Sequence, residues 1–119
     1  MNLSSIRGTI LNHEASVKGP QDETWKALAA GIVEQAADDY TNALRKLWGK
    51  KGNIKSKRKV LAERAELEEF FFSGWFETLT EINPDKLIFQ CRIAARNLVK
   101  KDIRRENHKK IMELLKEAE

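Results

Sequence analysis

The chain has 119 residues, 41% hydrophobic and 34% charged, with a formal net charge of +4 and a pI of about 9.3. A single cysteine, Cys91, excludes an internal disulfide and a cysteine-based zinc site, and no apolar run is long enough to predict a membrane span. Two prolines and six glycines interrupt the chain rarely, so we expect one all-α domain in a reducing compartment.

The first 19 residues are polar and irregular, with only scattered apolar positions such as Ile6, Ile10 and Leu11. They lack the apolar core of a signal peptide. We therefore expect residues 1–19 to form a poorly ordered N-terminal arm, and residues 20–119 to form a single helical domain.

A first helix is predicted from Pro20 to about Trp48. Proline suits a first helical position, and Gly49 and Gly52 follow the predicted end. Apolar residues recur in steps of three or four, as an amphipathic helix requires: Trp25, Leu28, Ile32, Ala36, Tyr40, Ala43 and Leu47.

A second helix is predicted from about Ser56 to Thr80, and it contains the aromatic run FFFSGWF. On a continuous helix, Phe71, Phe72, Trp75 and Phe76 share an arc of roughly 140°, as wide as a core-facing stripe. We expect most of this cluster in the core, with Trp25, Phe72, Trp75 and Leu98 buried and close together. Phe70 falls outside the arc, and an exposed contact patch around it is the alternative.

Glu68 lies in the middle of this predicted apolar arc. A lone buried carboxylate is unfavourable, so Glu68 should pair with Arg64 four residues earlier or with another base. Otherwise it marks a contact with a protein partner.

A third helix should begin at Pro84, with Asn83 as its N-cap. Its apolar stripe weakens after Val99 and returns at Ile111, so the basic C-terminal part is either a separate helix or a projecting extension. The expected fold is thus a compact bundle of three main helices with a basic C-terminal helix.

Basic residues gather in two blocks that could contact phosphates. The first block is predicted as a mobile loop between the first two helices and includes Lys55, Lys57, Arg58 and Lys59. The second is a ladder at four-residue spacing on the third helix: Arg92, Arg96, Lys100 and Arg104. The alternative is that both blocks are solvated faces, or pair with the acidic block between Glu63 and Asp85.

No catalytic or metal-binding pattern occurs in the sequence. His13 and His108 have no second ligand at zinc spacing, and there is no glycine-rich phosphate loop or nucleophile motif. Glu34 and Asp38 share a helix face, which is more typical of solvated residues than of a magnesium site. We expect a protein that is not an enzyme and that has no cofactor or metal.

The segment FFFSGWFETLTEINPDKLI resembles that of small uncharacterised helical proteins of bacteriophages and prophages with an FFxSxWFxxLT motif. The similarity extends over residues 38–88. It implies a helical fold and a phage setting, hence the cytoplasm of a bacterial host, and it supplies no catalytic residue.

Two functional hypotheses follow from these patterns. In the first, the basic blocks bind DNA or RNA, or a host nucleoprotein, in a regulatory role or against a host system. In the second, the chain is a helical interaction module that binds a host protein or a second copy of itself through Phe70 and Glu68, without a nucleic-acid role. Neither involves a membrane.

Overall fold

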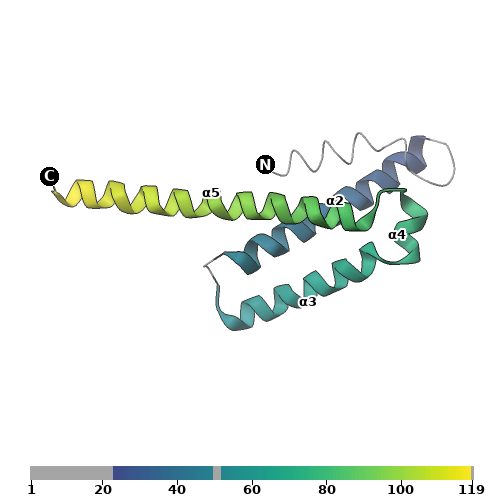
Figure 1. Cartoon of the computed structure of the whole chain (residues 1–119), viewed down its shortest axis with the longest axis horizontal. Helices are drawn as coiled ribbons and strands as arrows, with labels where there is room; N and C mark the ends of the chain where they lie inside the picture. Colours follow the sequence, from purple (N-terminus) through teal and green to yellow (C-terminus); the bar gives the residue numbers. More distant parts are fainter. Residues whose placement is uncertain (1–22, 50–51, 119) are drawn as a thin grey trace.

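A computed structural model describes residues 23–49 and 52–118. It contains four helices in these ranges: α2 (Glu23–Trp48), α3 (Ile54–Phe71), α4 (Gly74–Leu79) and α5 (Pro84–Ala118) (Figure 1). No β-strand occurs in this part of the chain, so the predicted all-α fold with three main helices is confirmed. The predicted arm of residues 1–19 and the helix start at Pro20 lie outside the described residues.

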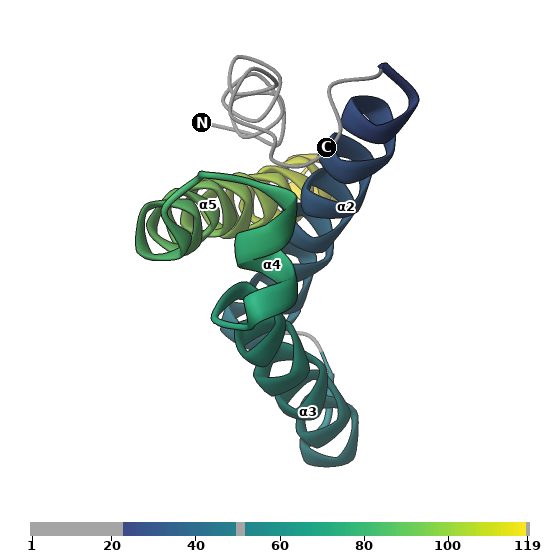
Figure 2. The ribbon, with the colours of Figure 1, turned by 90° about the vertical axis from the view of Figure 1, so that its right-hand side faces the viewer.

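Helix α2 is the centre of the molecule. Both α3 and α5 pack along it, whereas α3 and α5 hardly touch and diverge from each other (Figure 2). The buried face of α2 is built mainly from small residues, which let neighbouring helices approach closely. These residues are Ala29, Ala30, Val33, Ala36, Ala37, Thr41 and Ala43. Across the interface, the Cys91 Sγ of α5 lies 3.6 Å from the Ala37 carbonyl oxygen.

Aromatic packing closes one end of the molecule, where α4 joins α3 to α5. Phe71 and Phe76 are buried and meet edge to face, with ring centroids 5.7 Å apart. Tyr40 of α2 packs edge to face on Phe71, at 5.5 Å. We call this the closed end, and the opposite end, where α2 ends and α3 begins, the open end.

The predicted second helix is wrong in one respect, because it is two helices. Phe72 ends α3, and Ser73 caps α4 by accepting a hydrogen bond from the Phe76 amide at 3.2 Å. The Ser73 hydroxyl also donates to the Phe70 carbonyl at 2.6 Å, so it satisfies backbone groups on both sides of the break.

This break overturns part of the predicted core. Phe72 is 59% exposed and Trp75 is 52% exposed, so the expectation that both are buried is wrong. Leu98 is buried as expected, while Trp25 is half-buried against the core. The chain turns at Ser73, and the two aromatic residues that a continuous helix would direct inward therefore point to solvent.

The orientation of α3 also differs from the prediction, by about one residue. Its inner face carries Val60, Leu67 and Phe71, whereas Leu61 is half-exposed. One residue corresponds to about 100° of rotation on a helix. The inner face also includes Arg64 and Glu68. Because these two residues are charged, the sequence pattern does not show this side of α3 as its buried face.

Helix α5 has 35 residues and is therefore about 52 Å long. It begins at Pro84 as predicted, and the Asn83 side chain accepts a hydrogen bond from the Asp85 amide at 2.8 Å. Residues 107–118, the tail, are exposed throughout and extend past the ends of α2 and α3 (Figure 1). Of the two alternatives for the C-terminal part, the structure shows the projecting extension. Among the described helices, none is long and apolar enough to cross a membrane.

Candidate nucleic-acid interface

A polar network at the closed end joins three helices and shows where Glu68 belongs. One Glu68 oxygen, Oε1, accepts hydrogen bonds from the Tyr40 hydroxyl at 2.8 Å and from Arg64 Nε at 2.9 Å. The predicted pairing of Glu68 with Arg64 is therefore confirmed. The Glu68 carboxylate therefore makes its contacts with Tyr40 and Arg64, inside the fold.

The same network shifts the pKa values of its members. Burial by itself raises the pKa of Glu68, but hydrogen bonds from Arg64 and Tyr40, with the charges of Arg64 and Arg92, outweigh it and hold the pKa below the ordinary 4.5. Burial raises the pKa of Tyr40 above 10.0, the hydrogen bond to Glu68 raises it further, and Arg92 opposes both. Arg92 thus acts on the core network from α5.

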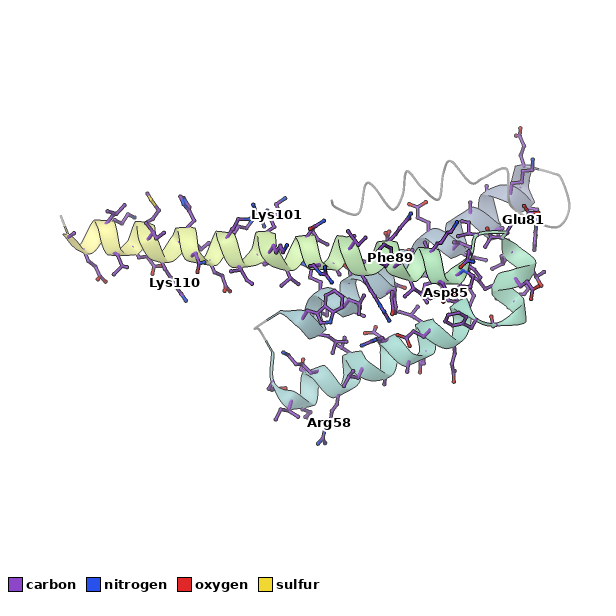
Figure 3. The ribbon with its side chains drawn as sticks, in the orientation of Figure 1. Arg58, Glu81, Asp85, Phe89, Lys101 and Lys110 are labelled. Atoms are coloured by element: carbon purple, nitrogen blue, oxygen red, sulfur yellow. The ribbon has the colours of Figure 1, made fainter. Side chains whose placement is uncertain are left out.

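Charges segregate along the long axis of the molecule. Acidic residues such as Glu81 and Asp85 lie at the closed end, whereas Arg58, Lys101 and Lys110 lie toward the open end (Figure 3). The described part of the open end from Arg45 to Val60 has six basic residues and no acidic one. This segregation creates a field that attracts anions to the open end.

The open end contains a cleft of about 690 Å³, because α3 and α5 diverge there over the end of α2. Five basic side chains line it, and they come from all three helices: Arg45, Lys46, Lys57, Arg105 and Lys109. Two acidic side chains, Asp102 and Glu106, also line it. The cleft is therefore positively charged, with an apolar floor that includes Val60 and Val99.

Two of these basic residues make contacts within the cleft wall. Arg45 donates two hydrogen bonds to Asp102, from Nε to Oδ2 at 2.9 Å and from a terminal nitrogen to Oδ1 at 2.6 Å. Lys57 Nζ donates to the Gly49 carbonyl at 3.0 Å, where it satisfies a backbone group after the end of α2. Lys46, Arg105 and Lys109 are exposed.

The start of α3 adds to the positive potential of the open end. Asn53 caps the helix by accepting a hydrogen bond from the Ser56 amide at 2.8 Å, and the first turn has no acidic residue. Helix N-termini are stabilised by acidic residues and carry a partial positive charge. In α3, lysine and arginine occupy the first turns instead, so their charges and the partial charge of the helix N-terminus repel each other. A bound anion would reduce this repulsion.

The first predicted block of basic residues is not a loop. Lys55, Lys57, Arg58 and Lys59 lie in the first turns of α3, which starts at Ile54. Lys57 lines the cleft, and the other three are exposed on α3 beside it; we call Lys55, Arg58 and Lys59 the α3 row. The loop prediction was wrong because the Asn53 cap starts the helix before the basic run.

The predicted ladder of Arg92, Arg96, Lys100 and Arg104 is exposed along α5, but it does not line the cleft. Successive ladder residues rotate by about 40° around the helix, and Lys100 lies on the face opposite Lys109. The structure therefore brings Lys57 into the cleft and leaves the ladder on another side of the molecule.

Arg105 and Lys109 were missed in the sequence although a signal was present. They continue the buried stripe of α5 after Leu98 and Asp102, in the same phase. Charged residues that replace apolar ones on a core-facing stripe indicate that the helix has left its core. A cleft lined by basic residues is the expected consequence.

No catalytic arrangement emerges from the described residues. Residues 23–49 and 52–118 contain no group of three or more His, Cys, Asp or Glu side chains that could hold a metal ion. Burial raises the pKa of the Cys91 thiol to about 11, and the residue lies in the core. A thiol in this state is a poor nucleophile.

Comparisons with family models, with curated proteins and with solved structures find no match to this chain.

Proposed function

We propose that this protein is a non-enzymatic binding protein that holds a nucleic-acid backbone, DNA or RNA, at its open end. Its target is nucleic acid or a nucleoprotein complex, in a regulatory role or one directed against a host system, and the resemblance to phage proteins favours a phage setting inside a bacterial host.

The observation that supports this proposal is the convergence of basic side chains from α2, α3 and α5 on one cleft. Phosphate contacts add up, and a groove lined by lysine and arginine follows a backbone without reading its sequence. The lining that residues 23–49 and 52–118 provide contains no aromatic residue on which a base could stack. We therefore expect binding dominated by phosphates and sensitive to salt.

The test compares two triple variants that remove the same charge. Lys46, Arg105 and Lys109 are replaced by Ala in the first, which leaves Lys57 and its bond to Gly49 in place. Arg96, Lys100 and Arg104 of the ladder are replaced in the second, and Arg92 is kept because it acts on Tyr40 and Glu68. Fluorescence anisotropy with labelled duplex DNA, single-stranded DNA and RNA measures affinity from about 50 to 200 mM salt.

The cleft variant should lose at least tenfold in affinity, and its slope of log K against log salt should be shallower by about three. The ladder variant should lose clearly less. A third variant, with Ala throughout the α3 row, should fall between them, since these residues flank the cleft. Equal losses from the cleft and ladder variants would contradict the cleft as the site. Absence of binding by the unmodified protein at 50 mM salt would contradict the nucleic-acid function.

A further inference from the structure

An apolar groove lies between α2 and α3, and it shares no lining residue with the basic cleft. Its volume is about 470 Å³. Among the described residues the lining is almost entirely apolar, with Asp39 as its only charged residue: Ala27, Leu28, Gly31, Ile32, Gln35, Ala36, Asp39, Leu67 and Phe70. Leu28 is 56% exposed, and Phe70, the predicted interaction residue, is half-buried in the groove wall.

Gly31 is unexplained by packing within the described part of the chain. It lies in the middle of α2, where glycine weakens a helix relative to alanine. It is exposed, and among the described residues no heavy atom outside its own helix backbone lies within 4 Å of a Cβ built on it. A glycine at such a position allows the backbone of another helix to approach closely.

The tail of α5 has the complementary surface. Ile111, Leu114, Leu115 and Ala118 follow the spacing i, i+3, i+4, i+7 of a helix that lies in a groove. The first three are all more than half-exposed. Arg104 lies in line with this stripe, toward the start of the helix, and Lys110 and Glu117 lie together along one edge of it, whereas Glu113 lies toward the opposite side of the helix.

The groove matches the tail in charge as well as in polarity. Asp39 lines it, and Glu63 and Glu66 are exposed on the same side of α3 as Leu67 and Phe70. The groove is therefore bordered by acidic residues, and the charge beside the apolar stripe of the tail is net basic, from Arg104 and Lys110 against Glu117. Such complementarity selects partner and orientation.

A tail and a groove of the same copy cannot meet. The groove side of α2 lies level with the start of α5, since Ala37 of α2 contacts Cys91. Ile111 follows Cys91 by 20 positions on one continuous helix, which places it about 30 Å away. The contact is therefore intermolecular.

We propose that the tail of one copy lies in the α2–α3 groove of a second copy, with Ile111, Leu114 and Leu115 against Leu28, Ile32 and Phe70. This association does not depend on nucleic-acid binding, because the apolar stripe and the basic cleft use different sides of α5. A three-turn helix in a groove forms an interface at the small end of the specific range, so an affinity on the order of 10 μM is expected.

The test uses one variant for each half of the contact. Leu114→Asp places a charge in the tail stripe, and Gly31→Leu fills the groove floor while favouring the helix. Both positions are exposed, so circular dichroism should show both variants folded. Phe89→Asp is the matched control, because Phe89 is exposed on α5 outside the tail and the groove.

Sedimentation is measured from about 5 to 200 μM, the range around the expected affinity. The unmodified protein and the Phe89→Asp control should associate as concentration rises, and each of the other two variants alone should stay monomeric. An equimolar mixture of Leu114→Asp and Gly31→Leu should associate again, since an intact tail and an intact groove are then present on different molecules. A monomeric unmodified protein, or a mixture that stays monomeric, would overturn the proposal. Association by Gly31→Leu alone would overturn it in favour of pairing between α5 helices.

Discussion

The two ends of the molecule contain the same three helices but differ in what lies between them. At the closed end, Phe71, Phe76 and Leu79 fill the space between helices, and the charged groups of Arg64 and Glu68 satisfy each other. At the open end, the described cleft lining has Val60, Val99 and Ile103 but no aromatic residue to fill the space, and α3 and α5 diverge around a basic cleft. Apolar burial thus decides where the helices stay together, and charge occupies the space where they separate.

The largest expected difference within the closed end is between two neighbouring phenylalanines. Phe71→Ala should lower the free energy of unfolding by about 3–5 kcal/mol, because it leaves a cavity beneath Tyr40 and Phe76. Phe72→Ala should change it by no more than about 0.5 kcal/mol, because the side chain is mainly in solvent. Urea denaturation of both variants measures the difference.

Phe72 serves as the control for Phe71, since both changes remove the same side chain from adjacent positions. Similar losses from the two variants would show that α3 does not end at this point. The expectation from a continuous helix, a large loss for Phe72→Ala, would then hold after all.

Where a helix N-terminus has a strong local signal, its position could be predicted from the sequence. Asn83–Pro84 is such a signal, because a cap and a proline act within one turn and need no tertiary contact. Ser73 was harder, since a serine–glycine pair inside an apolar run also fits a continuous helix. Its role as the cap of α4 depends on the hydrogen bonds of its hydroxyl with Phe76 and Phe70, which the sequence does not show.

The basic cleft and the orientation of α3 could not be predicted in the same way. Each depends on which helices share α2 as a neighbour, and that is a property of the whole fold. Arg64 and Glu68 look like solvent residues until Tyr40, 28 positions from Glu68, supplies the third partner. Lys57 was identified for its charge, whereas its place in the cleft follows from the position of α5.

A smaller effect is expected from the network that fixes α3 to α2. Tyr40→Phe or Glu68→Gln should lower the free energy of unfolding by about 1–3 kcal/mol, since the first removes the hydrogen bond to Glu68 and the second removes the charge that pairs with Arg64. Tyr40 itself is fully buried. Denaturation at neutral pH measures this loss, and Glu66→Gln on the exposed side of α3 is the control.

The same variants should change the pH dependence of stability. Because the pKa of Glu68 in the folded protein lies below 4.5, its contribution is complete above that value and is lost as pH falls through the folded pKa. Because the pKa of Tyr40 is raised, the fold holds that proton more tightly, and stability is lost as pH rises above 10.0. Glu68→Gln should therefore flatten the acid limb of the stability profile. An unchanged acid limb would contradict the role of Glu68.

The smallest expected effect belongs to the ion pair at the open end, between Arg45 and Asp102. Its geometry is bidentate, but the two side chains are 36% and 40% exposed, so water and salt screen the attraction. A double-mutant cycle with Arg45→Ala and Asp102→Ala should give a coupling of about 0.5–1 kcal/mol, and less in 1 M salt. The cycle is needed because Asp102 has a further interaction, which the single variant also removes. A coupling as large as the loss from Tyr40→Phe would mean that this pair, rather than apolar packing at the other end, sets how far α5 and α2 separate. The open end would then be a rigid cleft with a fixed width.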